Sequence, residues 1–257
     1  LLKVTMRTKI NIAALAVSWL IFAIVSHGQQ PVIPIVQGSY LLGGTQGGGW
    51  VSAEVAGKGL GTTVELKQIE ISSAVAKNVS GRTGEEWDAC PGQAIVRIDG
   101  GEDSEDMPGV FVGAGAAWNL VPRKPVEVSV KDAAYVRIAR AYLRSKGISR
   151  SPVKLTQVIE VDLEGDGTKE VLISGNYSRK PLELSYGDYS FTFIRYSVGK
   201  STKDLLIDGQ FLSRSIEFDL AEHSVEAIAD VNGDGRMEIA LSVTHSESYE
   251  QMLFEYN

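Results

Sequence analysis

Two nine-residue stretches of the chain carry oxygen-bearing side chains at matching positions. The first runs from Asp162 to Glu170, and the second runs from Asp230 to Glu238, 68 residues further along. Each offers side-chain oxygens at positions 1, 3, 5 and 9 and a backbone carbonyl at position 7, with a glycine at position 6 for a sharp turn. Hard cations such as Ca²⁺ select oxygen ligands arranged in this way. The spacing therefore predicts two calcium loops.

The residues that follow each loop argue against an EF-hand. An EF-hand closes its site with a bidentate glutamate at position 12, carried on a departing helix. Position 12 is Ile173 in the first loop and Leu241 in the second. Apolar, β-branched segments flank both loops, which favours strands rather than helices. Each loop is therefore predicted to join two strands, with the acids at position 9 closing the sites early.

A strand, the pattern D-x-[DN]-G-D-G-x-x-[DE] and a second strand together resemble the FG-GAP repeat (VCBS-type, integrin-α-like) of β-propeller proteins. The resemblance covers about residues 150–257 and rests on the loops. In that family the loop binds structural Ca²⁺ between two strands of a blade. The resemblance implies two sets of ligands: Asp162, Glu164, Asp166, the Thr168 carbonyl and Glu170 in the first loop, and Asp230, Asn232, Asp234, the Arg236 carbonyl and Glu238 in the second.

The two loops differ at position 3. Glu164 in the first loop is longer than the Asp or Asn usual there, whereas the second loop has the short Asn232. We therefore expect the second loop to bind Ca²⁺ more tightly. The alternative is that both loops are only the turns of tight hairpins, because Asn, Asp and Gly favour such turns for backbone reasons. Agreement at every ligand position favours two structural Ca²⁺ ions.

After Gly147 the chain is predicted to consist of strands and turns. The predicted strands are 153–161, 170–174, 189–198, 203–212, 225–229, 238–244 and 252–256. The loop spacing is close to one four-stranded propeller blade plus an insertion, but two blades cannot close a ring. The expected fold is therefore mainly β with one amphipathic helix (α+β). In it, two propeller-blade-like units form a small sheet packed on that helix.

One helix is predicted over residues 131–146. Its apolar residues recur at helical spacing on one face, and three arginines occupy the other face. Ser129 and Asp132 form an approximate capping box, and Gly147 is placed to end the helix in the left-handed conformation. The apolar face comprises Tyr135, Ile138, Ala139, Tyr142 and Leu143, and the basic face comprises Arg137, Arg140 and Arg144.

Residues 29–125 are predicted to form a β-rich region that precedes the helix and loops of residues 126–257. Its predicted strands are 50–55, 62–71, 93–98 and 110–112. Gly43 to Gly49 lacks the Gly-Lys-Ser/Thr ending of a phosphate-binding loop and is predicted to be a flexible turn. Glu102 to Asp106 is expected to be a solvated loop, with a third cation site as the alternative. Residues 122–125 are the predicted linker.

Residues 1–28 have the pattern of an export signal. A basic start at Met6 precedes an uncharged apolar run, and Ser26 and Gly28 stand at the −3 and −1 positions of a signal-peptidase site. Residues 1–5 are expected to be an upstream extension. Cleavage predicts a secreted, periplasmic or cell-envelope protein without a membrane span. The alternative is an uncleaved anchor.

The net charge and the single cysteine restrict the kinds of partner that this protein can have. The net charge is −7, and removal of residues 1–28, which hold three basic residues and no acid, changes it to −10. Such an acidic chain repels nucleic acid. Cys90 is the single cysteine, so no internal disulfide can form. It is expected to be a buried thiol, or else to pair outside this chain, for example in a C-terminal piece beyond the strand that ends at Asn257.

Two functional hypotheses follow. His223 and His245 are the histidines left after signal cleavage, and neither lies in a nucleophile or zinc motif. Glu85 to Asp88 combines acids with a tryptophan, as sugar sites do, or forms a polar turn around one core tryptophan. We expect an exported, non-catalytic calcium-binding module for surface binding or adhesion to a protein or glycan ligand. The alternative is a secreted carbohydrate-active hydrolase or its accessory domain.

Overall fold

The computed structural model describes residues 30–73, 75–84, 94–100, 107–180, 185–212, 220–246 and 248–256. Contacts divide the chain into two units, Leu1–Gln30 and Pro31–Asn257, and the second unit holds every helix and strand below. Four sequence-based predictions lie outside the described residues: the export signal, Cys90, the cluster from Glu85 to Asp88, and the loop from Glu102 to Asp106.

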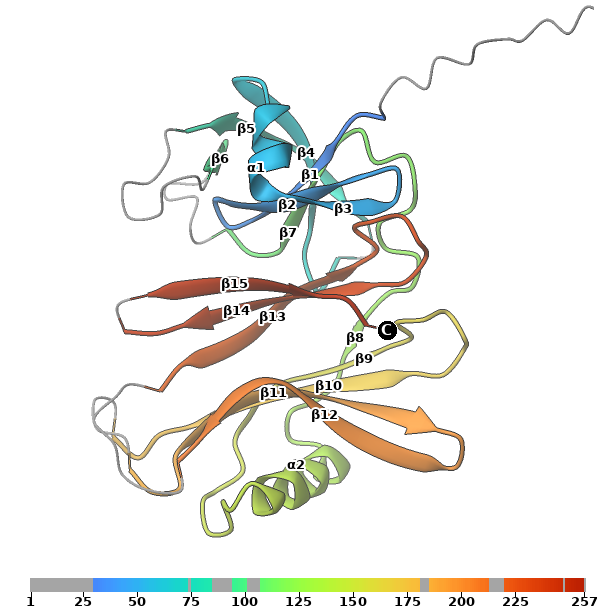
Figure 1. Cartoon of the computed structure of the whole chain (residues 1–257). Coiled ribbons are helices and arrows are strands. Elements are labelled where there is room, and N and C mark those ends of the chain that lie inside the picture. Colours follow the sequence, from blue (N-terminus) through green and yellow to red (C-terminus); the bar gives the residue numbers. More distant parts are fainter. Residues whose placement is uncertain are drawn as a thin grey trace, which may run out of the picture. The chain divides into compact units, whose positions relative to one another are not determined.

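The described chain is mainly β, as predicted, and its strands form three antiparallel sheets (Figure 1). In the seven-stranded sheet, which has the order β3-β2-β1-β7-β4-β5-β6, the strands are β1 (Ile33–Gln37), β2 (Tyr40–Gln46), β3 (Gly49–Ser52), β4 (Thr63–Ile69), β5 (Lys77–Thr83), β6 (Val96–Ile98) and β7 (Val110–Gly113). This sheet curls into a half-barrel, because an isolated bridge joins Tyr40 to Ile95, next to β6. Its inner core, which includes Leu66 and Phe111, is covered by helix α1 (Ala53–Lys58) through Ala56.

The five-stranded sheet has the order β12-β11-β10-β9-β8. Its strands are β8 (Val126–Glu127), β9 (Leu155–Val161), β10 (Glu170–Tyr177), β11 (Tyr189–Val198) and β12 (Ser201–Phe211). Helix α2 (Ala133–Ser145) packs on one face of this sheet, where its side chains share a core with Phe191 and Phe193. Gly147 follows the helix at a φ of 85°, which confirms the predicted helix and its ending. The predicted capping box is wrong, because Asp132 is itself the N-cap and accepts the Ala134 N–H, whereas Ser129 lies before the helix.

The three-stranded sheet contains β13 (Glu222–Ala229), β14 (Glu238–Thr244) and β15 (Tyr249–Phe254). Figure 1 shows this sheet, in red, between the two larger sheets. One continuous core joins all three, because the buried side chains of β13 and β14 contact Ile35 and Val112 from the seven-stranded sheet and Ile159 and Leu172 from the five-stranded sheet. Both faces of the three-stranded sheet are therefore covered.

Both predicted loops join antiparallel strands, as expected. The first lies between β9 and β10, and the second lies between β13 and β14. The expectation of a single sheet packed on the helix is wrong, because the two loop-bearing units belong to separate sheets. The reason is the composition of β14, whose residues from Glu238 to Val243 are all buried, so that this strand needs cover on both faces.

Of the predicted glycine-rich turn, only Gly47 and Gly48 lie in a turn. Gly43 and Gly44 lie within β2, where a Cβ atom on Gly44 would approach the Ile33 carbonyl oxygen to 2.6 Å. The glycines thus permit close strand pairing next to a bulge in β1. The expectation of a single helix is also wrong, since α1 forms where a strand was predicted. Ser52 caps it by accepting a hydrogen bond from the Val55 N–H.

No helix among the described residues is long and apolar enough to cross a membrane.

The ring of Tyr142 provides a test of packing in the α2 interface. It stacks on Phe193 at a centroid distance of 4.0 Å, and its hydroxyl is buried without a hydrogen-bond partner among the described residues. Burial raises the pKa of Tyr142 to about 12. We expect Tyr142→Phe to stabilise the fold by about 1 kcal/mol, because it keeps the ring and removes an unsatisfied hydroxyl. We expect Tyr142→Ala to cost about 3–5 kcal/mol. Urea unfolding measures both effects, and a destabilising Tyr142→Phe would contradict this account.

Candidate metal centre

The two loops share a set of internal hydrogen bonds. In each, the carboxylate at position 1 accepts N–H groups from positions 4 and 6, and the carboxylate at position 9 accepts the N–H of position 2. These bonds run from Gly165 and Gly167 to Asp162, from Leu163 to Glu170, from Gly233 and Gly235 to Asp230, and from Val231 to Glu238, at 2.6–3.0 Å. The sequence repeat is therefore also a repeat of backbone conformation.

The loops differ in the burial of their acids. Position 9 is buried in both, with Glu170 3% exposed and Glu238 1% exposed. In the second loop, Asp230 and Asn232 are also buried, and the Asn232 amide nitrogen donates to Glu238 at 3.1 Å. In the first loop, Glu164 is exposed at position 3. The second loop therefore holds more of its predicted ligands out of water.

One segment of the chain, Trp118 to Arg123, contacts both loops in the same way; we call it the bridging segment. The Trp118 indole N–H donates to the carbonyl oxygen of position 1 in the second loop, Asp230, at 2.8 Å. The Arg123 Nε donates to the equivalent carbonyl of the first loop, Asp162. The Arg123 Nη2 also donates to the Leu163 and Gly235 carbonyl oxygens, each at 2.8 Å. One guanidinium thus joins the two loops.

The bridging segment explains why position 4 is glycine in both loops. Gly165 and Gly233 have φ values of 79° and 83°, in the left-handed region that favours glycine. A Cβ atom at Gly233 would lie 2.9 Å from the Trp118 ring, and one at Gly165 would lie 2.9 Å from Arg123 Nη1. Position 4 therefore needs glycine both for its backbone conformation and for contact with the bridging segment.

We expect Arg123→Ala to destabilise the protein by about 2–3 kcal/mol, because it removes charge-assisted hydrogen bonds to three carbonyl oxygens. Arg123→Lys should recover less than half of this loss, since an ammonium group lacks the guanidinium fork. Thermal unfolding measures the effect. Arg137→Ala, on the exposed face of α2, is the matched control and should change stability by less than about 0.5 kcal/mol. Equal effects of the two alanine variants would contradict the bridging role.

A carboxylate from outside the loop, Glu255, lies at the second loop and was not predicted from the sequence. Carboxylate oxygens of Asp234, Glu238 and Glu255 all lie within 4.8 Å of one another. Oxygen ligands about 2.3–2.6 Å from one Ca²⁺ lie at most about 5 Å apart, so this spacing fits a single cation. The pairing of β14 with β15, in which Ile239 faces Phe254, places Glu255 beside Glu238.

Among the described residues, no acid stands at the first loop where Glu255 stands at the second. In its sheet the corresponding pairing, in which Val171 faces Arg195, places Tyr196 beside Glu170. Glu164 lies 4.0 Å from Arg236 Nη2 of the second loop, so its carboxylate pairs with a cation of the protein. Both observations make the second loop the better candidate for a cation site, and the order of affinity predicted from position 3 stays a prediction.

Burial raises the pKa of the loop acids. It raises the pKa of Glu238 to about 8, and the nearby Asp234 and Asp230 charges act in the same direction. Desolvation by burial also raises the pKa of Glu170 and of Asp230. Hydrogen bonds from backbone N–H groups lower these pKa values but do not offset the burial. These acids are therefore stable in the fold only when they are protonated or when a positive charge lies next to their carboxylates.

The raised pKa of Glu238 predicts a pH-dependent stability in chelator. The pKa of Glu238 rises from 4.5 to about 8 on folding, so ionisation of its carboxyl group opposes folding. The stability that the protonated carboxyl group contributes is complete below about pH 4.5 and is lost as the pH rises to about 8. Glu238→Gln should therefore stabilise the metal-free protein more at about pH 8 than at about pH 5, by at most a few kcal/mol, because one pKa unit corresponds to about 1.4 kcal/mol. Urea unfolding in EDTA measures this, and a pH-independent difference would contradict it.

The structure brings His223 into a chain of polar groups that the sequence did not indicate and that is buried at Ser190 and His223 but partly exposed at Asp208. Its Nδ1 lies 2.7 Å from Ser190 Oγ, and its Nε2 lies 2.9 Å from Asp208 Oδ2. This chain joins β11, β12 and β13. Ser190 is 0% exposed, so its hydroxyl cannot meet a substrate, and the chain links two sheets rather than forming a nucleophile. His245 lies 3.8 Å from Glu250.

Comparison with protein-family models, with curated proteins and with solved structures finds no match to this chain. The likeness to FG-GAP repeats therefore rests on the two loops alone.

Proposed function

We propose that this protein is an exported, non-catalytic binding module whose fold is stabilised by two structural Ca²⁺ ions. The observation that carries the proposal is the repeated loop with a buried glutamate at position 9, above all the cluster in which the exposed Asp234 and Glu255 lie next to the buried Glu238. Bound Ca²⁺ would neutralise the negative charge of these carboxylates. Localisation in the periplasm, at the cell envelope or outside the cell rests on the signal pattern in residues 1–28.

The donor set of each loop suits Ca²⁺. The second site would use side-chain oxygens of Asp230, Asn232, Asp234 and Glu238, the Arg236 carbonyl, and Glu255 from the end of β15. The first would use Asp162, Glu164, Asp166, the Thr168 carbonyl and Glu170. All of these donors are oxygen atoms, which Ca²⁺ prefers to the nitrogen and sulfur ligands of zinc. The hydrogen bonds within the loops leave further oxygen lone pairs for an ion.

A structural role for calcium follows from the positions of the loops. Each loop joins two adjacent strands of its sheet, and the bridging segment holds the loops together. Fixing both loops would therefore stabilise the ends of the five-stranded and three-stranded sheets at once. The chain also has a polar pocket lined by residues of β9, β10, β13, β14 and β15, His223 among them, and none of the proposed ligands lines it. The ions would therefore act on the fold rather than on a molecule bound there.

Calcium titration tests the proposal. We expect isothermal calorimetry to give close to two sites and the melting temperature to rise with Ca²⁺, since a ligand at 100 times its Kd adds about 2.7 kcal/mol of stability. Asp234→Ala should reduce this calcium-dependent shift more than Asp166→Ala, because the second site is more buried and includes Glu255. Asp99→Ala, at an exposed ion pair with Arg82, is the matched control and should leave the shift unchanged.

The absence of binding heat, together with a melting temperature indifferent to EGTA, would refute the calcium sites. Equal effects of Asp234→Ala and Asp166→Ala would agree with two calcium sites but contradict the expected order of their affinities.

A further inference from the structure

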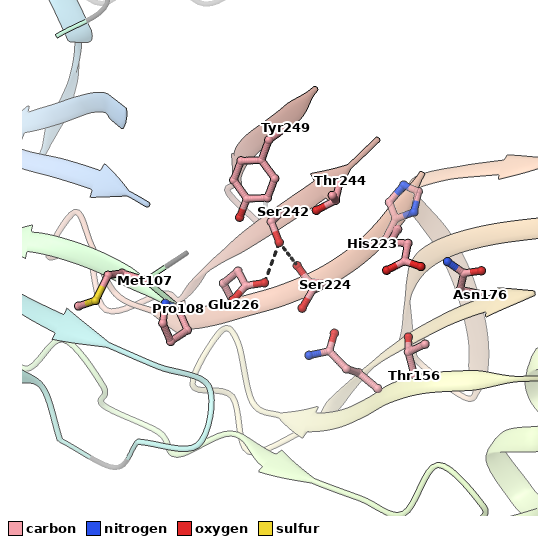
Figure 2. A pocket seen from close by; sticks show the side chains of 12 residues that line it. Met107, Pro108, Thr156, Asn176, His223, Ser224, Glu226, Ser242, Thr244 and Tyr249 are labelled. Carbon is pink, nitrogen blue, oxygen red and sulfur yellow. Dashed lines mark hydrogen bonds between the residues drawn. The ribbon is translucent and has the colours of Figure 1, made fainter. Parts of the chain in front are cut away.

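A polar pocket of about 650 Å³ lies at the start of strands β9 and β13, away from the calcium loops that follow the ends of these strands. Figure 2 shows Ser224 and Glu226 on β13, with Ser242, Thr244 and Tyr249 on the next two strands of the same sheet. The five-stranded sheet contributes polar side chains from β9 and β10, and Met107 and Pro108 line the remaining side.

The walls of this pocket are fixed by hydrogen bonds. Glu226 accepts a hydrogen bond from Ser242 Oγ at 2.7 Å. Gln157 pairs with the backbone of Val225 in both directions, at 2.8 and 3.0 Å. The ring of His223 is held between Ser190 and Asp208. A site whose walls are already ordered loses little conformational entropy on binding.

Four other polar side chains in the pocket have no hydrogen-bond partner within the part of the chain that the structure describes. The side chains of Thr156, Asn176, Thr244 and Tyr249 make no hydrogen bond to any residue that the structure describes. They come from four strands in two sheets, and all line one hollow. Hydroxyl and amide groups both donate and accept hydrogen bonds. Together these side chains offer both hydrogen-bond donors and hydrogen-bond acceptors to a ligand in the pocket.

The charge of the pocket restricts the ligand. Glu222 and Glu226 line it, and the described residues that line it include neither lysine nor arginine. Phosphate, sulfate and carboxylate groups would therefore be repelled. A molecule rich in alcohol hydroxyls matches the mixed donors and acceptors without adding negative charge. The ring of Tyr249, which is 38% exposed, can also cover the C–H face of such a molecule.

We propose that this pocket binds a saccharide unit that carries no acidic group. The inference deepens the proposed role of a binding module by naming a ligand class and a site. It rests on the binding role but not on the calcium loops, because the pocket and the loops share no residue.

The test uses the purified full chain with a panel of glucose, galactose, mannose, N-acetylglucosamine and glucosamine, and with glucuronate as the acidic probe. Saturation-transfer NMR in the millimolar range detects binding, and ¹⁵N chemical-shift mapping locates it. We expect at least one neutral or amine-bearing sugar to shift the signals of Asn176 and of residues 222–226, and glucuronate to shift neither. Tyr249→Ala and Asn176→Ala should each weaken binding at least about fivefold, as loss of about 1 kcal/mol implies.

Tyr186→Ala is the matched aromatic control, because Tyr186 is 46% exposed and does not line the pocket, and it should leave sugar affinity unchanged. Far-UV circular dichroism confirms that each variant is folded. Binding of none of the neutral and amino sugars, shifts that map elsewhere, or full affinity in Tyr249→Ala would overturn the inference. Sugar binding without calcium heat would refute the calcium sites alone, whereas calcium binding without sugar binding would refute this pocket alone.

Discussion

The apolar character of the three-stranded sheet on both faces is the constraint on which the arrangement depends. Nearly all residues of β14 are buried, so this strand is stable only when a larger sheet covers each face. The curled seven-stranded sheet and the helix-backed five-stranded sheet supply that cover through one shared core. Because the loop-bearing strands β9 and β13 both belong to this packing, the two loops come close enough for Arg123 to contact both.

Electrostatics sets the second constraint. The fold buries carboxylates at position 9 of both loops, and it adds Glu255 to a cluster that already contains Asp234 and Glu238. Burying acids without a compensating charge is costly, as the raised pKa of Glu238 shows. The bridging segment supplies only part of the compensation, since Arg123 donates to loop carbonyl oxygens rather than to these carboxylates. A divalent cation would supply the rest.

The ends of the same strands serve different chemistry. At their starts, β9 and β13 contribute to a polar pocket, and buried hydrogen bonds through Gln157 and His223 hold the two sheets together there. At their ends, they lead into the loops. A sheet interface of this kind would allow the proposed ligand site and the proposed metal site to act independently, because each is held by its own local contacts.

The sequence by itself determined the features that depend on neighbouring residues. The loop spacing, the strands on either side of it and the amphipathic helix from Asp132 to Gly147 could all be predicted, because side-chain periodicity and turn chemistry are local. The sequence also distinguished the two loops, through the longer Glu164 at position 3 of the first loop. It did not indicate α1, whose six residues have no helical stripe and depend on the burial of Ala56 against the half-barrel.

Only the tertiary structure decided which distant residues complete each site. Glu255 reaches Glu238 through strand pairing, Trp118 and Arg123 reach the loops from a segment more than 35 residues away, and the His223 chain joins three strands. Such contacts depend on the order and register of strands, and these are fixed by which faces must be buried together. No short pattern records that choice, since it is a property of the whole core rather than of any one segment.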